Sequence, residues 1–353
     1  MLSKIKILWF FVILSLLVTG YGYLFKYSLG APRVVSWWVH DTITKKKKIS
    51  DSITRDKRIV IISGSNGLFG IDSKILEDKT GIPVVNFALH ASLSIDFYKM
   101  IVEKNIRRGD IVIIPLEYNY YFLNDKYNDW FVDNMISWGD EYLDWLNIID
   151  YWEFISHVDL QKIVSGSLSN FMIRNGSSYK SKLNSDDEIA TYLYDGNFHG
   201  YDFRSVNNHG DIITPKENKR LVIDLINNPG KNKEVLYYMK KHKISNYGIL
   251  SIASLINSIE KKGAIAVLTW PVSINSNYFN SNDNESQKMI AEISNELSNK
   301  NININCDPWS VNMPPSLFYD TSYHPNGEGA KIRTESLYSC LVDNKIITQS
   351  ARH

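Results

Sequence analysis

Two segments far apart in the chain carry side chains that could perform acyl chemistry. Ser65 lies in the stretch GSNGLFGID, after the apolar run RIVII, and the late stretch FYDTSYHPN places Asp320 and His324 in one loop. A serine hydroxyl becomes a useful nucleophile when a histidine takes its proton and an acid orients that histidine. GSNG alone is equally typical of a structural turn. The prediction of a catalytic triad, Ser65 with Asp320 and His324, therefore depends on both ends of the chain.

A sharp turn from a strand into a helix would expose Ser65 and aim backbone N–H groups at a developing oxyanion. Gly64 and Gly67 leave room for such a turn. His90 and His40 are competing bases, but a histidine without an orienting acid is more often structural. We therefore expect His324 to act as the base toward Ser65 and as the acid toward the leaving group.

These blocks resemble the SGNH (GDSL-like) hydrolase superfamily, in which the serine lies in an N-terminal Gly-x-Ser-type block and the acid and histidine share a C-terminal loop. The resemblance extends from about residue 58 to the end of the chain. The chain looks most similar to the membrane-anchored branch that O-acetylates bacterial cell-surface polysaccharides, often beside a membrane-bound O-acyltransferase. The resemblance implies that Ser65, Asp320 and His324 form the triad.

The intermediate blocks depart from the superfamily pattern, which completes the oxyanion hole with a glycine N–H and an asparagine side chain. In NFALHAS, Ala88 stands where glycine is expected, and in PLEYN, Glu117 stands near the expected asparagine. The backbone N–H groups of Ser65 and Ala88 remain the implied donors, and Asn66 or Asn119 could replace the missing amide. Glu117, Asn119 and the more distant Trp130 are candidates for substrate binding. The spacing from Asp320 to His324 is one residue longer than the usual D-x-x-H.

Short apolar runs alternating with helical stretches predict the elements that position these residues. Strands are expected at residues 58–62, 84–87, 110–115, 264–268 and 301–305, and helices at 94–105 and 247–262. Alternation of this kind predicts an α/β fold with a doubly wound parallel sheet. The resemblance narrows this to the flavodoxin-like three-layer α/β/α architecture of the SGNH type.

The alternation is lost between about residues 119 and 246, which are expected to form a helical, aromatic-rich insertion or cap within a catalytic domain of residues 58–353. Four tryptophans there recur at steps of eight, seven and seven, so a continuous helix would place them along one side. That stripe could be the buried face of cap helices or a surface for carbohydrate or a membrane partner. The four are Trp130, Trp138, Trp145 and Trp152.

The N-terminus predicts a membrane anchor over residues 1–26, because residues 7–25 carry no charge and are long enough to span a bilayer. A cleaved signal peptide is the alternative, but no clear cleavage site follows. Residues 27–57 are expected to form a juxtamembrane linker whose lysine run, 45–48, is either solvated or in contact with anionic lipid. Positive charges flank the helix on both sides, and its short basic lead favours a single-pass anchor in the cytoplasmic membrane with the body outside the cytoplasm.

Composition excludes several other classes of protein. The formal net charge of +1 gives no reason to expect nucleic-acid binding. The histidines are scattered, and there is no H-E-x-x-H, C-x-x-C, phosphate loop or dinucleotide fingerprint, so neither a metal nor a cofactor is predicted. Cys306 and Cys340 could form one disulfide in an oxidising compartment or remain two buried thiols.

The sequence and the resemblance together lead to two expected functions. The first is an enzyme that moves an acyl group, by the resemblance acetyl, to or from hydroxyls of a cell-surface polysaccharide through an acylated Ser65. It would work in the cell envelope, by the resemblance beside a membrane-bound O-acyltransferase. The second is a non-catalytic glycan-binding or assembly protein of the envelope that keeps the fold.

Overall fold

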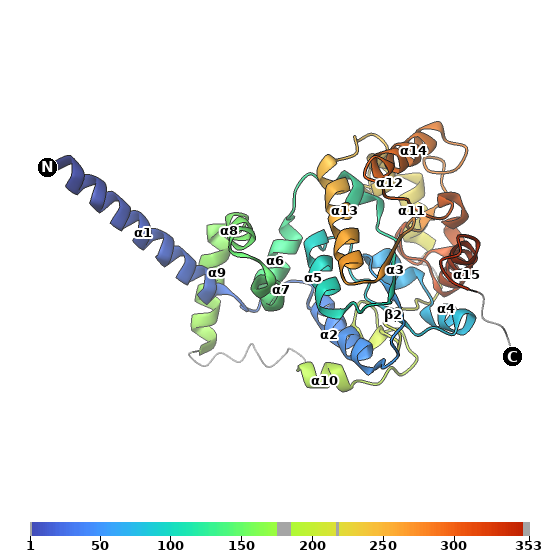
Figure 1. Ribbon diagram of the computed structural model, residues 1–353, viewed down its shortest axis with the longest axis horizontal. Coiled ribbons are helices and arrows are strands. Elements are labelled where there is room, and N and C mark those ends of the chain that lie inside the picture. Colours follow the sequence, from blue (N-terminus) through green and yellow to red (C-terminus); the bar gives the residue numbers. More distant parts are fainter. Residues whose placement is uncertain (1, 175–184, 217–218, 349–353) are drawn as a thin grey trace. The chain divides into compact units, whose positions relative to one another are not determined.

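The computed structural model describes residues 2–174, 185–216 and 219–348 (Figure 1). The chain divides into two compact units: unit 1 comprises Met1–Trp37 and Tyr127–Asn184, and unit 2 comprises Trp38–Lys126 and Ser185–His353. The segment expected to be one insertion, residues 119–246, is therefore shared between the units. Residues 175–184 and 217–218 of that segment lie outside the described residues.

Unit 2 is built on a four-stranded parallel sheet with the strand order β2-β1-β3-β4. The strands are β1 (Ile59–Ile61), β2 (Val84–Asn86), β3 (Ile111–Ile114) and β4 (Ile265–Leu268). Their β-branched side chains are buried throughout β1, β2 and β3, as expected for parallel strands covered on both faces. The predicted α/β class, the parallel sheet and these four strands are confirmed. The predicted strand at 301–305 is wrong, because only Asn305 pairs there, in a single bridge to Thr269.

The chain crosses from β1 to β2 in one direction and from β2 past β1 to β3 in the other. Right-handed crossovers in opposite directions place their helices on opposite faces of a sheet. The contacts agree with this, because α3 (Ser65–Gly70) and α4 (Ser73–Thr80) pack with α15 (Gly327–Asp343), whereas α5 (Ile95–Asn105) packs with α13 (Asn246–Lys261). The predicted helices at 94–105 and 247–262 correspond to α5 and α13.

Smaller elements complete unit 2. The helices are α10 (Asp186–Thr191), α11 (Lys219–Asn227), α12 (Val235–Met239) and α14 (Asn284–Ser298), and a second, two-stranded sheet pairs β5 (Ser273–Ile274) with β6 (Asn312–Met313). Short 3-10 helices are η1 (Tyr118–Phe122), η3 (Phe203–Ser205), η4 (Pro308–Val311) and η5 (Pro315–Leu317).

The expected juxtamembrane linker contains a helix of the folded core, α2 (Trp37–Ser52). Within its lysine run, Lys45 is 4% exposed and Lys46 is fully buried. Lys45 donates to the carbonyl oxygens of Phe203 and Val206, and Lys46 donates to the carbonyl oxygen of Ala88. For these two lysines, both expected roles, a solvated face and lipid contact, are wrong, because their ammonium groups satisfy carbonyls inside unit 2.

Unit 1 contains α1 (Leu2–Ser28), α6 (Asp129–Trp138), α7 (Asp140–Trp145), α8 (Ile148–Ser156) and α9 (Leu160–Arg174). α1 is the one described helix long and apolar enough to span a membrane. The four tryptophans do not share a continuous helix, because Gly139 and Asn147 cap separate helices between them. The buried side chains of these helices are others, including Phe131, Met135, Tyr142 and Phe154.

Cys306 and Cys340 form a disulfide, with their Cα atoms 5.5 Å apart. This resolves the alternative left open by the sequence in favour of a bonded pair. The bond joins the segment after Asn305 to α15, the helix that packs against α3 and α4.

Candidate active site

Ser65 is the first residue of α3, placed where the chain leaves β1 and turns sharply into the helix. Its side chain is 8% exposed. The turn requires glycine at position 64, because a Cβ there would lie 2.4 Å from a carboxylate oxygen of Glu117 and 2.7 Å from the Cα of Ala91. The chain thus presents a serine at the carboxyl end of β1, beside β3, where the strand order reverses. In open α/β sheets this is the usual position of a ligand site.

Glu117, which follows β3, holds this turn from inside the protein. It is fully buried, and its two carboxylate oxygens accept the N–H groups of Gly64 (3.2 Å) and Asn66 (2.9 Å). Burial raises the pKa of Glu117, and the hydrogen bonds from Asn66 and Gly64 oppose that rise. Arg333 of α15 donates to both the backbone and the side-chain oxygen of Asn66. The predicted substrate-binding role of Glu117 is therefore not supported, since the carboxylate binds backbone and is closed to solvent.

Asp320 and His324 are brought together by a tight loop between Phe318 and Pro325, which pair in an antiparallel bridge. The Tyr319 N–H donates to the carbonyl oxygen of His324 at 2.8 Å, so the lengthened spacing is taken up by the loop. His324 Nδ1 lies 2.8 Å from Asp320 Oδ1. Burial would raise the pKa of Asp320, but the hydrogen bond and charge of His324 outweigh it and the pKa is lowered. Asp320 is therefore an ionised partner that can hold the Nδ1–H tautomer.

Tyr201 is a member of this group that the sequence did not indicate. Its hydroxyl donates to Asp320 Oδ2 at 2.5 Å and lies 3.1 Å from His324 Nδ1. Its ring contacts those of Trp38 and Phe69, each at a centroid distance of 5.5 Å. Tyr201 follows Gly200 in a polar stretch with no helical or strand period, so no spacing connects it to the C-terminal loop.

Ser65 and His324 line one cavity of about 430 Å³. Phe69, one turn after Ser65 on α3, packs its ring 4.3 Å from the imidazole of His324. No hydrogen bond joins the Ser65 hydroxyl to His324, or to any other described residue. Catalytic hydrogen bonds are often long in the absence of substrate. The other residues that line the cavity are partly apolar and partly polar or charged. They include Leu221, Asp224, Leu225, Asn232, Lys233, Glu234, Val235 and Ser322.

Two of the three predicted oxyanion donors are engaged elsewhere. The Ala88 N–H donates to Asn86 Oδ1 at 2.8 Å. The Asn66 amide donates to Ser63 Oγ (2.8 Å) and to the Pro115 carbonyl (2.7 Å), and its backbone N–H is bound to Glu117. These assignments are therefore corrected. The Ser65 N–H, the third predicted donor, makes no hydrogen bond to any of the described residues.

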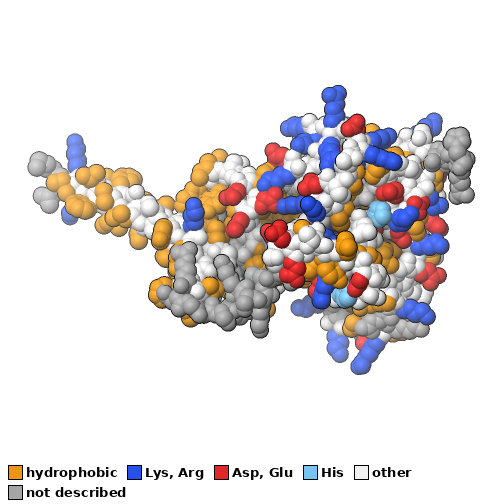
Figure 2. Space-filling model, turned by 90° about the horizontal axis from the view of Figure 1, so that it is seen from below, with side chains coloured by type: hydrophobic (Ala, Val, Ile, Leu, Met, Phe, Trp, Pro, Cys, Tyr) orange, Lys and Arg blue, Asp and Glu red, His pale blue; other side chains and the backbone are white. Residues whose placement is uncertain are grey.

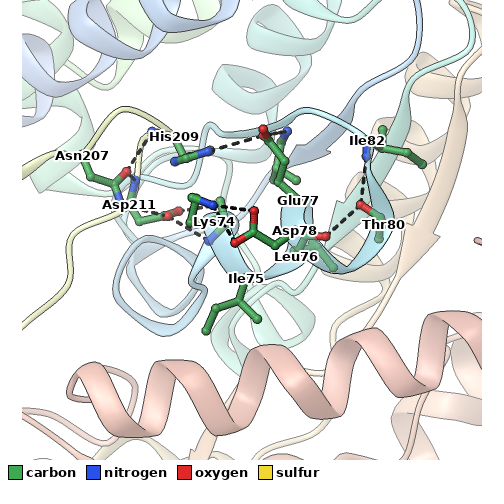
Figure 3. A network of polar contacts seen from close by, with 12 residues as sticks. Lys74, Ile75, Leu76, Glu77, Asp78, Thr80, Ile82, Asn207, His209 and Asp211 are labelled. Atoms are coloured by element: carbon green, nitrogen blue, oxygen red, sulfur yellow. Dashed lines mark hydrogen bonds and ion pairs between the residues drawn. The ribbon is translucent and has the colours of Figure 1, made fainter. Parts of the chain in front are cut away.

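The loop after β2 is fixed by a buried polar network around Asp211. This carboxylate accepts from the Asn86 amide (2.8 Å) and from the backbone and hydroxyl of Ser73 (2.9 and 2.7 Å). Figure 3 shows its further contact with Asn207, beside the pairing of His209 with Glu77. Burial lowers the pKa of Lys46 to about 7, against the charge of Asp211. The network thus ties the end of β2 to the start of α4, and the Asn86 amide also donates to the Gly67 carbonyl of α3 at 2.9 Å.

The remaining candidates have other roles or positions. Asn119 donates its amide to the Ala91 carbonyl at 3.1 Å and so braces the loop next to Gly64. His90 accepts the Ser92 N–H on Nδ1, and burial, followed by the charge of His324, lowers the pKa of His90 to about 4. It is therefore neutral at physiological pH. Trp130 belongs to unit 1 and is not part of the cavity lining. Within the described ranges no cluster of His, Cys, Asp and Glu could hold a metal ion.

Comparisons with known proteins identify no family for this chain. No protein-family model matches the chain, and no curated protein does. A crystal structure of protein YXIM from Bacillus subtilis aligns with 82% of this chain, at 11% identity and a TM-score of 0.34. The chain spans 57% of the length of that structure. A similarity at this level indicates neither a family nor an activity.

Proposed function

We propose that the protein is a serine-dependent acyl-transfer enzyme of the SGNH type with a doubly wound three-layer catalytic unit. The observation that carries the proposal is one cavity lined by Ser65 and by the Asp320–His324 pair. Ser65 Oγ attacks the acyl carbonyl, and His324 Nε2 takes the hydroxyl proton. His324 then returns that proton to the leaving group, and an acceptor hydroxyl or water releases the acyl group in the reverse sequence of steps.

Three features support action on a glycan of the cell envelope, next to the membrane. α1 is consistent with a retained anchor, and the Cys306–Cys340 disulfide fits an oxidising compartment outside the cytoplasm. The polar groups of the cavity suit a hydroxyl-rich acceptor better than a wholly apolar one. Acetyl as the acyl group, a cell-surface polysaccharide as the acceptor and a membrane-bound O-acyltransferase as the partner rest on resemblance to the SGNH superfamily alone.

The proposal is tested by labelling the full chain with a fluorophosphonate probe, which reacts with activated serines. Wild type should label, and Ser65→Ala and His324→Ala should not. Ser322→Ala is the matched control, because Ser322 lines the same cavity but gives its hydroxyl to Glu234 Oε1 at 2.5 Å. A wild type that never labels, or a Ser65→Ala variant that still does, would end the catalytic proposal. Mass spectrometry of the surface glycan with and without the gene then identifies the acceptor.

A second candidate function is a non-catalytic glycan-binding or assembly protein. It is favoured by the engagement of the Ala88 N–H and the Asn66 amide, which leaves the candidate oxyanion site with few donors. Removal of one such donor costs an acyl-transfer enzyme roughly 10²–10³ in rate. Glycan binding without fluorophosphonate labelling would select this alternative.

A further inference from the structure

Helix α9 of unit 1 exposes a row of large apolar side chains. The members recur at steps of four, four and three residues, which places them on one side of the helix. Each of these side chains is about half exposed, so no other described element buries it. The row consists of Leu160 (60% exposed), Val164 (47%), Leu168 (58%) and Phe171 (59%).

The same stretch of α9 exposes no charge along the row. The exposed residues beside it are Gln161, Ser165 and Met172. Lys162, the charged residue between 160 and 173, lies off the row and forms an ion pair with Asp133 at 2.9 Å. A solvent-facing helix normally carries charged side chains on its outer face, so this face is suited to an apolar environment.

Helix α8 carries a second group of exposed apolar side chains. Ile148 and Ile149 in its first turn are 69% and 78% exposed, and Trp152 is 42% exposed. The ring of Trp152 lies against Gly22 of α1, 3.9 Å from where a Cβ would be. The exposed apolar surface of α8 is therefore continuous with that of α1.

Both helices are fastened to the C-terminal part of α1. Asn170 of α9 donates to the carbonyl oxygens of Tyr27 and Leu29, each at 2.9 Å. Gly166 approaches the backbone of Ser28 so closely that a Cβ would lie 2.9 Å from its oxygen. Figure 2 shows the apolar side chains that cover α1 and continue at its base. The depth at which α1 sits in a bilayer would thus fix the depth of α8 and α9.

The aromatic residues of α1 indicate that depth. Tyr21, Tyr23 and Tyr27 lie in its last two turns, and tyrosine is enriched where a spanning helix leaves the hydrocarbon. The Tyr21 hydroxyl reaches the carbonyl oxygen of Val158, between α8 and α9. The exposed rows therefore lie at the level where α1 would cross the interface, a position suited to in-plane helices.

We propose that α8 and α9 form a membrane-facing collar around the base of α1, with Leu160, Val164, Leu168 and Phe171 in contact with lipid of the leaflet that α1 enters at its C-terminal end. The inference rests on the anchoring by α1 in the proposed function. Lipid is chosen over a protein partner because the collar surface continues the surface of α1 that faces lipid, and because the row on α9 itself carries no exposed charge that would select a partner.

The experiment uses the full chain, purified and reconstituted into vesicles of phosphatidylcholine with and without brominated acyl chains. The two native cysteines are bonded, so a single introduced cysteine can carry an environment-sensitive fluorophore. Labels are placed at Leu168→Cys on α9, at Val12→Cys on α1 and at Lys288→Cys, an exposed position on α14 of unit 2. Val164→Cys provides a second label on the same row if Leu168→Cys folds poorly.

The collar predicts that bromolipid quenches the label at position 168 at least about two-fold more than the label at 288, with a blue-shifted emission. Quenching at position 12 with none at 168 or 164 would overturn the collar while leaving the anchor intact, and would assign the face to a protein partner. Absence of quenching at position 12 would overturn the anchor, and the collar with it.

Discussion

His324 is held by two oxygens on its Nδ1 side. The phenolic hydrogen of Tyr201 goes to Asp320 Oδ2, so the Tyr201 oxygen and Asp320 Oδ1 both face Nδ1 as acceptors, at 3.1 and 2.8 Å. Such an arrangement keeps the imidazole hydrogen on Nδ1 and leaves Nε2 free to accept a proton. In the proposed mechanism, Tyr201 is therefore a positioning residue that acts through Asp320 and His324.

Tyr201→Phe should lower kcat/KM by roughly ten-fold, because it removes one hydrogen bond to a charged group while leaving the ring in place. The tyrosine hydrogen bond helps to lower the pKa of Asp320, so its loss raises that pKa toward the ordinary value. Because the proposed mechanism needs ionised Asp320, the acidic limb of the pH profile should move upward, by roughly half a pH unit.

The measurement is kcat/KM for an activated ester between about pH 4 and 9. The same substitution should leave thermal stability almost unchanged, since the contacts with Trp38 and Phe69 are made by the ring. A variant that loses activity without any movement of the acidic limb would contradict the positioning role and indicate a packing defect.

At the residue scale, the features that could be predicted from the sequence are local ones: two residues that share a loop, or a residue that directly follows a strand. Asp320 and His324 share a loop, and Ser65 follows a buried strand, so residue type and order were informative. Tyr201 was missed because its partner lies 119 positions away. Ala88 and Asn66 were misassigned as oxyanion donors because the availability of an N–H depends on neighbouring acceptors, which only the folded loop specifies.

At the scale of elements, the N-terminal turn of α3 is held by the end of β3 and by α15. Glu117 after β3 accepts two of its N–H groups, and Arg333 on α15 binds the oxygens of Asn66. Burial lowers the pKa of Arg333 to about 9, against the charge of Glu117. Glu117, near the position where asparagine was expected, therefore holds the backbone on both sides of Ser65, the proposed nucleophile.

Glu117→Gln should destabilise the fold by about 1–3 kcal/mol, because an amide NH₂ would replace one of two acceptors and leave a buried N–H unpaired. The labelling rate of Ser65 should fall with it. Urea unfolding and fluorophosphonate labelling measure the two effects. Glu234→Gln is the matched control: Glu234 is also buried and binds the Tyr237 N–H, but its second partner, Ser322, has a hydroxyl that can rotate to accept. Equal effects of the two substitutions would contradict the bracing role of Glu117.

The strands and the helices that flank them could be predicted because their apolar runs are continuous and end at glycine or polar residues. α2 could not, because a run of four lysines indicates a solvated surface whenever its tertiary partners are unknown. The burial of Lys45 and Lys46 depends on the carbonyls of Val206 and Ala88, which come from segments far away in the sequence.

At the scale of the whole molecule, the Cys306–Cys340 disulfide encloses the part of the chain that completes the site. Asp320, His324 and Arg333 all lie between the two cysteines, which are 34 residues apart. The bond therefore restricts the segment that carries the proposed base, the acid paired with it and the arginine that holds the turn around Ser65. In a reducing compartment this restriction would be lost.

Replacing both cysteines by serine should lower the free energy of unfolding by about 3.8 kcal/mol, the loop-entropy value for cysteines 34 residues apart. The labelling rate of Ser65 should also fall, because the 318–325 loop and α15 gain alternatives to their folded positions. Urea unfolding of the full chain, with and without a reductant, provides the measurement. Reduced wild type should behave like the double variant, and the double variant should not respond to reductant. Identical unfolding curves for oxidised and reduced wild type would show that packing alone holds the base against α3.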